Sequence, residues 1–107
     1  MIPADLLDQL RETDEELFLK VIGGFPLKNG KYLSMLDMKP PAAHAWLQHC
    51  LQEAIRWRGY SHELKYLATS QTAIADIYFE NSTWSAEGTT EAEALLRAYL
   101  AAIQEAA

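Results

Sequence analysis

The 107 residues carry a net charge of −6, and half of them are hydrophobic, so the chain can bury the core of one domain spanning residues 1–107. Its only cysteine, Cys50, excludes an internal disulfide and fits a reducing compartment. No apolar run approaches the roughly 18 residues of a membrane span, and no secretion signal opens the chain, which predicts a soluble cytoplasmic protein without a membrane partner.

Residues 1–22 predict an acidic helical segment in two parts. Pro3 stands near the first helical position, and three leucines that follow share one helix face. Thr13 and Glu16 have the spacing of a capping box, which predicts a break near Thr13 and a second helical stretch to about Ile22. The leucines are Leu6, Leu7 and Leu10.

Residues 23–40 predict a loop between the acidic segment and the core. Two glycines at 23–24 end the preceding helix, and the pair Asn29-Gly30 favours a tight type I′ turn. The segments beside that turn are short and alternate weakly. A small hairpin and a loop with a tight turn therefore both remain open.

Residues 41–58 predict the longest helix, which Gly59 ends. Its polar residues His44, Gln48, Gln52 and Arg56 recur at intervals of four, opposite a broad apolar face that we expect to pack against a sheet. The apolar face comprises Ala43, Trp46, Leu47, Cys50, Leu51, Ala54, Ile55 and Trp57.

Three strands and a final helix complete the predicted core, over 41–107. The segments 62–69 and 73–80 have strand character, the second with a period of two, and a short strand follows at 83–86. Thr90 and Glu93 form a second capping box at the start of a helix running to about residue 105. We therefore predict an α+β fold with an α-β-β-β-α core, in which helices pack a three-stranded antiparallel sheet, preceded by the N-terminal helical segment.

The side chains that bind metals or act as nucleophiles have no recognised spacing. His44, His49, Cys50 and His62 match no zinc motif, and His49 points about 100° away from Cys50 around their helix. Carboxylates gather at helix starts, where they complement the helix dipole. We expect no catalytic residue, no metal site and no cofactor, and hence no enzyme.

The charge is divided along the chain. Residues 1–16 hold six acids against Arg11, a net of −5; residues 17–75 hold seven bases against three acids, a net of +4; residues 76–107 hold six acids against Arg97, again −5. If the two ends lie side by side, they form a negative surface that repels phosphate and favours basic proteins. The alternative is that these acids are ordinary solvated helix faces.

The order α-β-β-β-α resembles the double-stranded RNA-binding domain, and "GTTEAEALLRAYL" (88–100) lies where that family opens its last helix. The resemblance implies lysines at this corner that grip phosphate, whereas here Glu91 and Glu93 repel it. Nucleic acid is thus disfavoured as a partner. An alternative route to it remains through Arg56, Arg58, Lys65 and the loop 28–39.

Two further resemblances concern small bacterial and phage proteins. The runs "AAHAW" (42–46), "RWRGYSHELKY" (56–66) and "TEAEALLRAYLAA" (90–102) resemble the uncharacterised phage and prophage ABA-sandwich domain family, which implies a fold and a phage-like origin. The corner formed by Gly88, Thr90, Glu93 and Ala94 is similar to that of HicB-like antitoxins. That similarity implies, as an alternative, an acidic antitoxin holding a small basic toxin.

These observations together predict a non-catalytic, phage-type accessory protein that binds a protein with a basic surface. A concrete form is an anti-CRISPR-like inhibitor of a host defence system, whose acidic surface competes for a basic nucleic-acid channel. The sequence also leaves a homodimer open. The expected partner-binding residues are Asp5, Asp8, Glu12, Glu15, Glu16, Glu87, Glu91 and Glu93.

Overall fold

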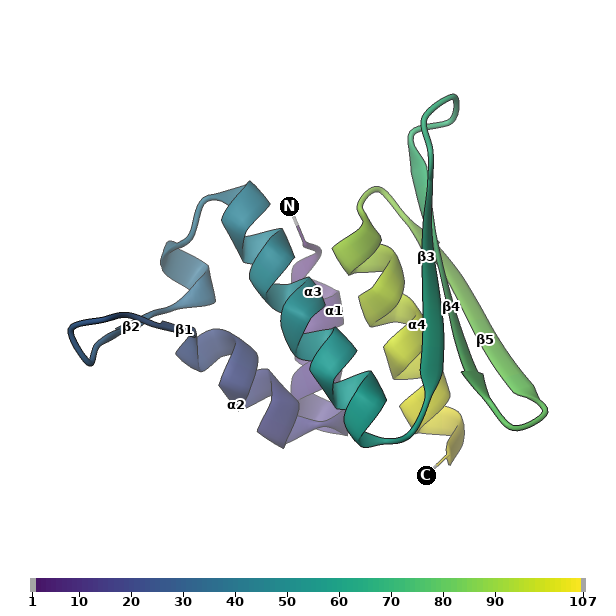
Figure 1. Ribbon diagram of the computed structural model, residues 1–107, viewed down its shortest axis with the longest axis horizontal. Helices are drawn as coiled ribbons and strands as arrows, with labels where there is room; N and C mark the ends of the chain where they lie inside the picture. The colour runs from purple at the N-terminus through teal and green to yellow at the C-terminus, as the bar shows by residue number, and fades with distance from the viewer. Residues whose placement is uncertain (1, 107) are drawn as a thin grey trace.

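The computed structural model describes residues 2–106, and within them the chain forms four α-helices and a three-stranded antiparallel sheet (Figure 1). The predicted α+β class is confirmed. The elements are α1 (Ala4–Thr13), α2 (Glu15–Gly23), β1 (Phe25–Pro26), β2 (Tyr32–Leu33), the 3-10 helix η1 (Met35–Asp37), α3 (Pro40–Trp57), β3 (Ser61–Leu67), β4 (Thr72–Phe79), β5 (Ser82–Gly88) and α4 (Glu91–Ala106).

The sheet has the order β3-β4-β5, and its central strand separates two different faces. Leu64 of β3 and Ala86 of β5 both lie opposite Ala75 of β4. Along β4 the side chains alternate, with Ala73, Ala75 and Ile77 buried and their neighbours only half-buried. The small alanines let a helix approach this face closely, whereas the other face remains open.

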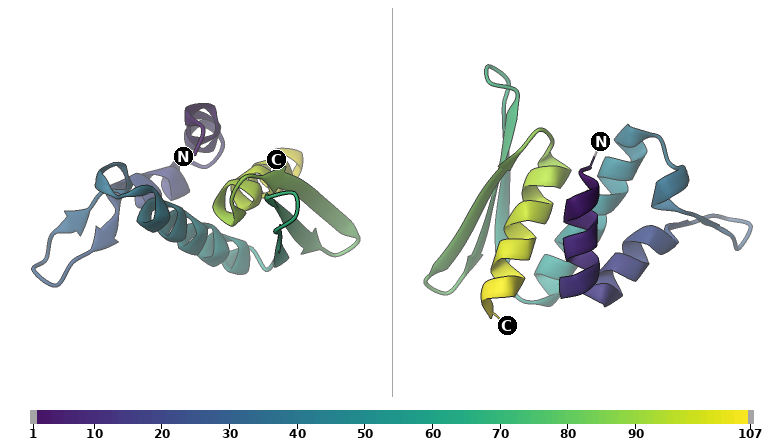
Figure 2. Two further views of the ribbon diagram at one scale, coloured as in Figure 1. Left: turned by 90° about the horizontal axis from the view of Figure 1, so that it is seen from above. Right: turned by 180° about the vertical axis from the view of Figure 1, so that it is seen from behind.

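Helix α4 lies at the centre of the fold. It packs on β4 and β5, and α1 and α3 pack beside it (Figures 1 and 2). We expected α3 to cover the sheet, but it packs mainly on α4 and α2 and has only a small contact with the sheet, at β3. The reason is that α4 is apolar almost all round, as buried elements are, and occupies the sheet face itself. Its buried apolar residues are Ala92, Ala94, Leu95, Leu96, Ala98, Tyr99, Leu100, Ala102 and Ile103.

The two predicted capping boxes have different outcomes. At α4 the Oγ1 of Thr90 accepts the Glu93 amide at 3.2 Å, which confirms this half of the predicted box. The Glu93 carboxylate accepts the amide of Thr89 at 3.2 Å, one residue before the amide that the box predicts. At α2 the prediction was wrong by one residue. Asp14 is the N-cap and accepts the amide of Leu17, while the hydroxyl of Thr13 donates back to the carbonyl of Gln9 in α1.

These caps predict unequal effects for two similar substitutions. Thr90→Ala removes an N-cap acceptor and should lower the free energy of unfolding by about 1 kcal/mol. Thr13→Ala removes only a hydroxyl that bonds back to its own helix, and we expect a loss below about 0.5 kcal/mol. Urea denaturation of both variants measures the difference, and equal losses would contradict the assignment of the caps.

Residues 23–40, expected to be a loop, contain a small hairpin and one 3-10 turn. Strands β1 and β2 pair antiparallel, and the Asn29 side chain accepts the amide of Lys31 at 3.0 Å across the turn. Of the two alternatives left open by the sequence, the hairpin is therefore the one that forms. It projects from the helices at the end of α2 (Figures 1 and 2), with Phe25 packed edge-on against Trp46 at 5.5 Å between ring centroids.

No helix in the described part of the chain is both long and apolar enough to cross a membrane.

Candidate functional site

Two surface hollows lie along the seam between α2 and α3. The first, of about 690 Å³, is next to the end of α3, and the second, of about 550 Å³, is next to the hairpin. Lys20 and Glu53 line both hollows, and their side chains form an ion pair at 3.4 Å. His49 also reaches the Glu53 carboxylate, at 2.6 Å. The seam therefore forms one interrupted groove, with this cluster of polar groups at its middle.

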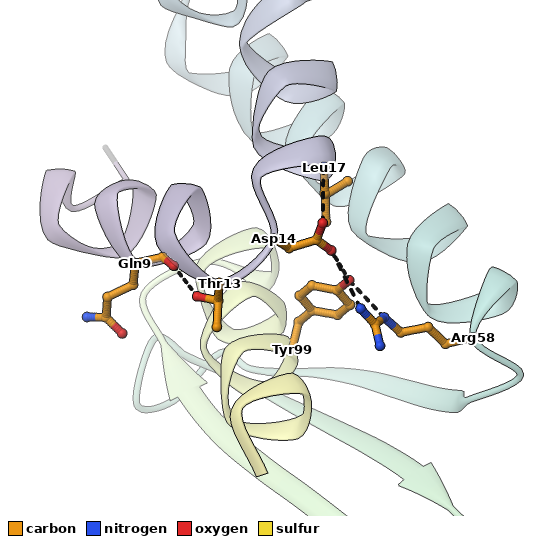
Figure 3. A network of polar contacts seen from close by, with 6 residues as sticks. All are labelled: Gln9, Thr13, Asp14, Leu17, Arg58 and Tyr99. Carbon is orange, nitrogen blue, oxygen red and sulfur yellow. Dashed lines mark hydrogen bonds and ion pairs between the residues drawn. The ribbon is translucent and has the colours of Figure 1, made fainter. Parts of the chain in front are cut away.

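Three of the residues that line the first hollow, Asp14, Arg58 and Tyr99, form a polar network, which Figure 3 shows. The hydroxyl of Tyr99 donates to Asp14 at 2.6 Å and accepts from the Nε of Arg58 at 3.1 Å. Asp14 also caps α2 through the amide of Leu17. One carboxylate thus links the start of α2 to the end of α3 and to the middle of α4, which makes the network a structural junction.

Two titratable groups near this junction, the Tyr99 phenol and the Cys50 thiol, have raised pKa values and stay in their neutral, protonated forms. Burial and the hydrogen bond to Asp14 raise the pKa of Tyr99 above its ordinary value of 10.0, so the phenol remains protonated. Burial also raises the pKa of the Cys50 thiol to about 11. A protonated, fully buried thiol is a poor nucleophile, and Cys50 therefore acts as a small packing residue.

Trp57 stands at the rim of the first hollow and is 90% exposed. We expected it on the buried face of α3, and that expectation was wrong. It follows Ile55, which is fully buried, by two positions, and two positions turn an α-helix by about 200°. The indole consequently points to solvent from the last turn of α3.

The other end of the seam carries a concentration of exposed apolar side chains, which we name the hairpin surface. Tyr32 is 68% exposed and Leu36 is 70% exposed, and Phe25 and Tyr32 also line the second hollow. Six of the ten large apolar side chains exposed within residues 2–106 belong to this surface. They are Leu19, Phe25, Leu27, Tyr32, Leu33 and Leu36.

Sequence reasoning missed the hairpin surface. The strands are two residues long, too short for an alternating pattern to mark which side chains face solvent. One available signal was composition. Residues 25–36 contain six large apolar residues, yet no helical or strand period assigns them to a core.

The predicted acidic residues of the N-terminal segment are exposed. Asp5, Asp8 and Glu12 follow one another at spacings of three and four along α1, and Glu15 and Glu16 begin α2. Only Asp8 among these five has an ion-pair partner in the described residues, with Arg11 at 3.6 Å. The five residues are named the acidic stripe.

The predicted acidic residues near α4 do not join that stripe into one exposed surface. Helices α1 and α4 do lie side by side and run in the same direction (Figure 2), so the two acidic ends of the chain are neighbours. Glu87 is exposed and Glu91 is half-buried at the β5–α4 corner. Glu93, however, is only 7% exposed, because its carboxylate caps α4 and pairs with Arg97 at 3.5 Å. Its carboxylate is therefore engaged within the protein and leaves little surface exposed.

The basic residues in the middle of the sequence lie in separate parts of the fold. Lys28 and Lys31 lie in the turn of the hairpin, Lys39 directly precedes α3, and Arg56 and Arg58 lie at the far end of α3. Lys65 lies on β3, on the open side of the sheet. These bases therefore do not form the continuous positive track that usually follows a nucleic-acid backbone.

The histidines do not gather around Cys50. Within residues 2–106 no three His, Cys, Asp or Glu side chains are arranged to hold a metal ion. His62 lies 3.3 Å from the side-chain nitrogen of Gln52, and burial followed by the charge of Arg56 lowers its pKa below 6.5. Burial likewise lowers the pKa of His44.

Comparison with known proteins gives no match, since no family model, curated protein or solved structure is similar enough to this chain to assign it to a family.

Proposed function

We propose that this protein is a non-catalytic binding protein whose partner is another protein. The hairpin surface is the observation that carries the proposal. Large exposed apolar side chains are concentrated on the projecting hairpin and on the segments beside it, and exposed apolar groups concentrated in this way commonly mark protein interfaces. Tyr, Phe and Leu side chains beside a hollow supply the buried anchors on which such interfaces depend.

The partner segment is proposed to lie along the α2–α3 seam. The seam has aromatic groups at both ends, with Trp57 at one and Phe25 and Tyr32 at the other, and hollows between them. Tryptophan and tyrosine are the residues most enriched among those that dominate binding energy. A segment lying along the seam would cover all three rings and would exclude water from the Lys20–Glu53 ion pair.

The acidic stripe has a separate role in this proposal. It begins beside the seam, since Glu16 lines the first hollow, and it continues along α1 away from the hairpin. Exposed charge of one sign accelerates the approach of a partner with the opposite sign more than it strengthens the final complex. We therefore expect a basic partner, with an association rate that falls as salt rises while the dissociation rate changes little.

The biological form proposed is a phage-type accessory protein that inhibits a host defence system by occupying a nucleic-acid-binding protein. Its support is the acidic stripe and the phage-family resemblance of residues 42–102. The antitoxin alternative differs in its partner, which would be a small basic toxin. Both forms use the same surfaces and differ in what is bound.

Site-specific photo-crosslinking tests the proposal in cells. A photoreactive residue at Tyr32, on the hairpin surface, should cross-link to one discrete protein, identified by mass spectrometry. The same residue at Thr83, exposed on the open side of the sheet, is the matched control. Identical products from both positions, or no protein product from Tyr32, would contradict the proposed surface.

A nucleic-acid partner is tested in parallel because lysines flank the aromatic rings of the hairpin. A gel-shift titration at low salt should show no binding by the purified protein. Binding that weakens steeply with salt, and that Lys28→Glu together with Lys31→Glu abolishes, would replace the protein partner by phosphate neutralisation.

A further inference from the structure

Strand β3 is an edge of the sheet, and its outer side is unpaired. Its seven residues pair continuously with β4 on one side, and no backbone group among residues 2–106 bonds to its other side. Helix α3 touches β3 through Gln52 and His62, whose side chain lies on the helix side of the sheet, so α3 does not take the place of a further strand. The β3–β4 hairpin also extends past the helices at its tip (Figure 1).

Proteins usually protect an exposed edge strand, and β3 lacks most of the usual devices. It contains no proline, and its register with β4 is uninterrupted, so there is no bulge. Exposed apolar groups, Tyr66 at 48% and Leu67 at 40%, lie toward its end. Its only two charged residues, Glu63 and Lys65, both point to the open face of the sheet.

The sequence of β3 is complementary to itself about Leu64. If two copies pair antiparallel with Leu64 opposite Leu64 of the second copy, Glu63 of each lies opposite Lys65 of the other. Both residues are exposed, and both lie on the same face of the strand. Opposite charges directly across an antiparallel pair attract, and this register supplies two such pairs.

A local conflict within the monomer favours the same arrangement. Glu63 lies directly opposite Asp76 of β4, and two acids in this position repel each other. In the paired arrangement Lys65 of the second copy lies on the outer side of Glu63. Glu63 then has a repulsive neighbour, Asp76, on one side and an attractive lysine on the other. The serine at 85 already makes a hydrogen bond to Asp76 from the β5 side.

We propose that two copies of this chain associate through β3, antiparallel and centred on Leu64, to form a six-stranded sheet. The other edge strand, β5, offers no equivalent, because pairing it with itself about Ser85 would place Glu87 opposite Thr83. This inference goes beyond the proposed function, since the seam and the β3 edge are formed by different elements. The proposed dimer can therefore be disproved without affecting the proposed partner site at the seam, and the reverse also holds.

Sedimentation velocity over a wide range of protein concentration tests the dimer. Wild type should shift from monomer to dimer, and Glu63→Lys should raise the dissociation constant about tenfold, because two attractive pairs become repulsive. The swap Glu63→Lys with Lys65→Glu should restore wild-type affinity. Glu87→Lys makes the same charge change on β5 and should have no effect. A wild type that is monomeric throughout, or a swap that fails to restore the dimer, would overturn the proposal.

Disulfide trapping tests the register. Protein carrying Glu63→Cys, mixed with protein carrying Lys65→Cys, should form a covalent dimer on oxidation, because only the mixture places the two thiols opposite each other. Each variant alone should form no covalent dimer, because its own two thiols do not lie opposite each other in this register. Cys50 is fully buried and does not compete. Equal trapping in the mixture and in the separate samples would exclude this register and with it the proposed dimer.

Discussion

Gly24→Ala should cause the largest loss of stability of any single methyl addition to this chain. Gly24 has φ +95° and ψ −173°, a region that is almost exclusive to glycine. An added Cβ would also lie 1.9 Å from the carbonyl oxygen of Leu33, which is backbone and cannot rotate away. We expect a loss of at least about 3 kcal/mol in the free energy of unfolding, with the hairpin displaced.

Two other glycines separate the causes of that loss. Gly30 has φ +81° but open space around its Cβ position, so Gly30→Ala should cost only the backbone strain of about 1 to 2 kcal/mol. Gly23 has neither feature and ends α2, so Gly23→Ala should be neutral or slightly stabilising. Urea unfolding ranks the three variants. A Gly24→Ala protein as stable as Gly30→Ala would contradict the close packing of the hairpin against the end of α2.

Asp14→Ala should also destabilise the protein strongly, because it removes three interactions at once. The carboxylate caps α2, accepts the Tyr99 hydroxyl at 2.6 Å and lies 3.8 Å from Arg58. Loss of the cap costs about 1 kcal/mol, and a buried phenol left without its acceptor costs about 1 to 3 kcal/mol more. We expect a total of about 2 to 4 kcal/mol in urea denaturation.

The variants Asp14→Asn and Tyr99→Phe separate the contribution of the helix cap from that of the Tyr99 hydrogen bond. Asparagine caps helices as well as aspartate does, so Asp14→Asn should retain α2 through its one acceptor oxygen. It has no second acceptor oxygen, and it should therefore lose the hydrogen bond from the Tyr99 hydroxyl together with the attraction to Arg58. In a double-mutant cycle, Asp14→Ala should cost less in the Tyr99→Phe background, because no phenol is then left unpaired. Strictly additive losses would show that the network does not act as a unit.

The raised pKa of Tyr99 predicts that the free energy of unfolding depends on pH in the alkaline range. Because folding raises the pKa of Tyr99 above 10.0, the unfolded chain loses this proton first. The contribution of Tyr99 to stability is therefore complete below about pH 10 and is lost progressively as pH rises above it. The stability difference between wild type and Tyr99→Phe, measured against pH, should shrink in that range. A constant difference would contradict the raised pKa.

Periodic patterns were sufficient to predict most of the fold. The alternation along β4 and the apolar stripe of α4 indicated the sheet and the helix that covers it, because burial imposes those periods directly. The spacing of Thr90 and Glu93 allowed the start of α4 to be predicted. The packing of α3 could not be obtained in this way, since a broad apolar face indicates burial without identifying the neighbour.

The candidate site was less predictable because it arises from what the fold leaves uncovered. The outward position of Trp57 depends on where the last turn of α3 meets its neighbours, and the hairpin surface depends on strands of two residues. For Glu93 the sequence itself contained a signal of low exposure. Its charge suggested a contact residue, while its position three residues after Thr90 already indicated a cap.

The most direct test of the account is the affinity of the cross-linked partner for paired aromatic variants, measured by calorimetry with purified proteins. Phe25→Ser and Tyr32→Ser should each raise the dissociation constant at least about tenfold, as expected for central anchors. Phe79→Ser changes an exposed phenylalanine outside the seam and should leave affinity unchanged. Equal effects of Phe25→Ser and Phe79→Ser, or no effect of either, would contradict binding through the hairpin surface.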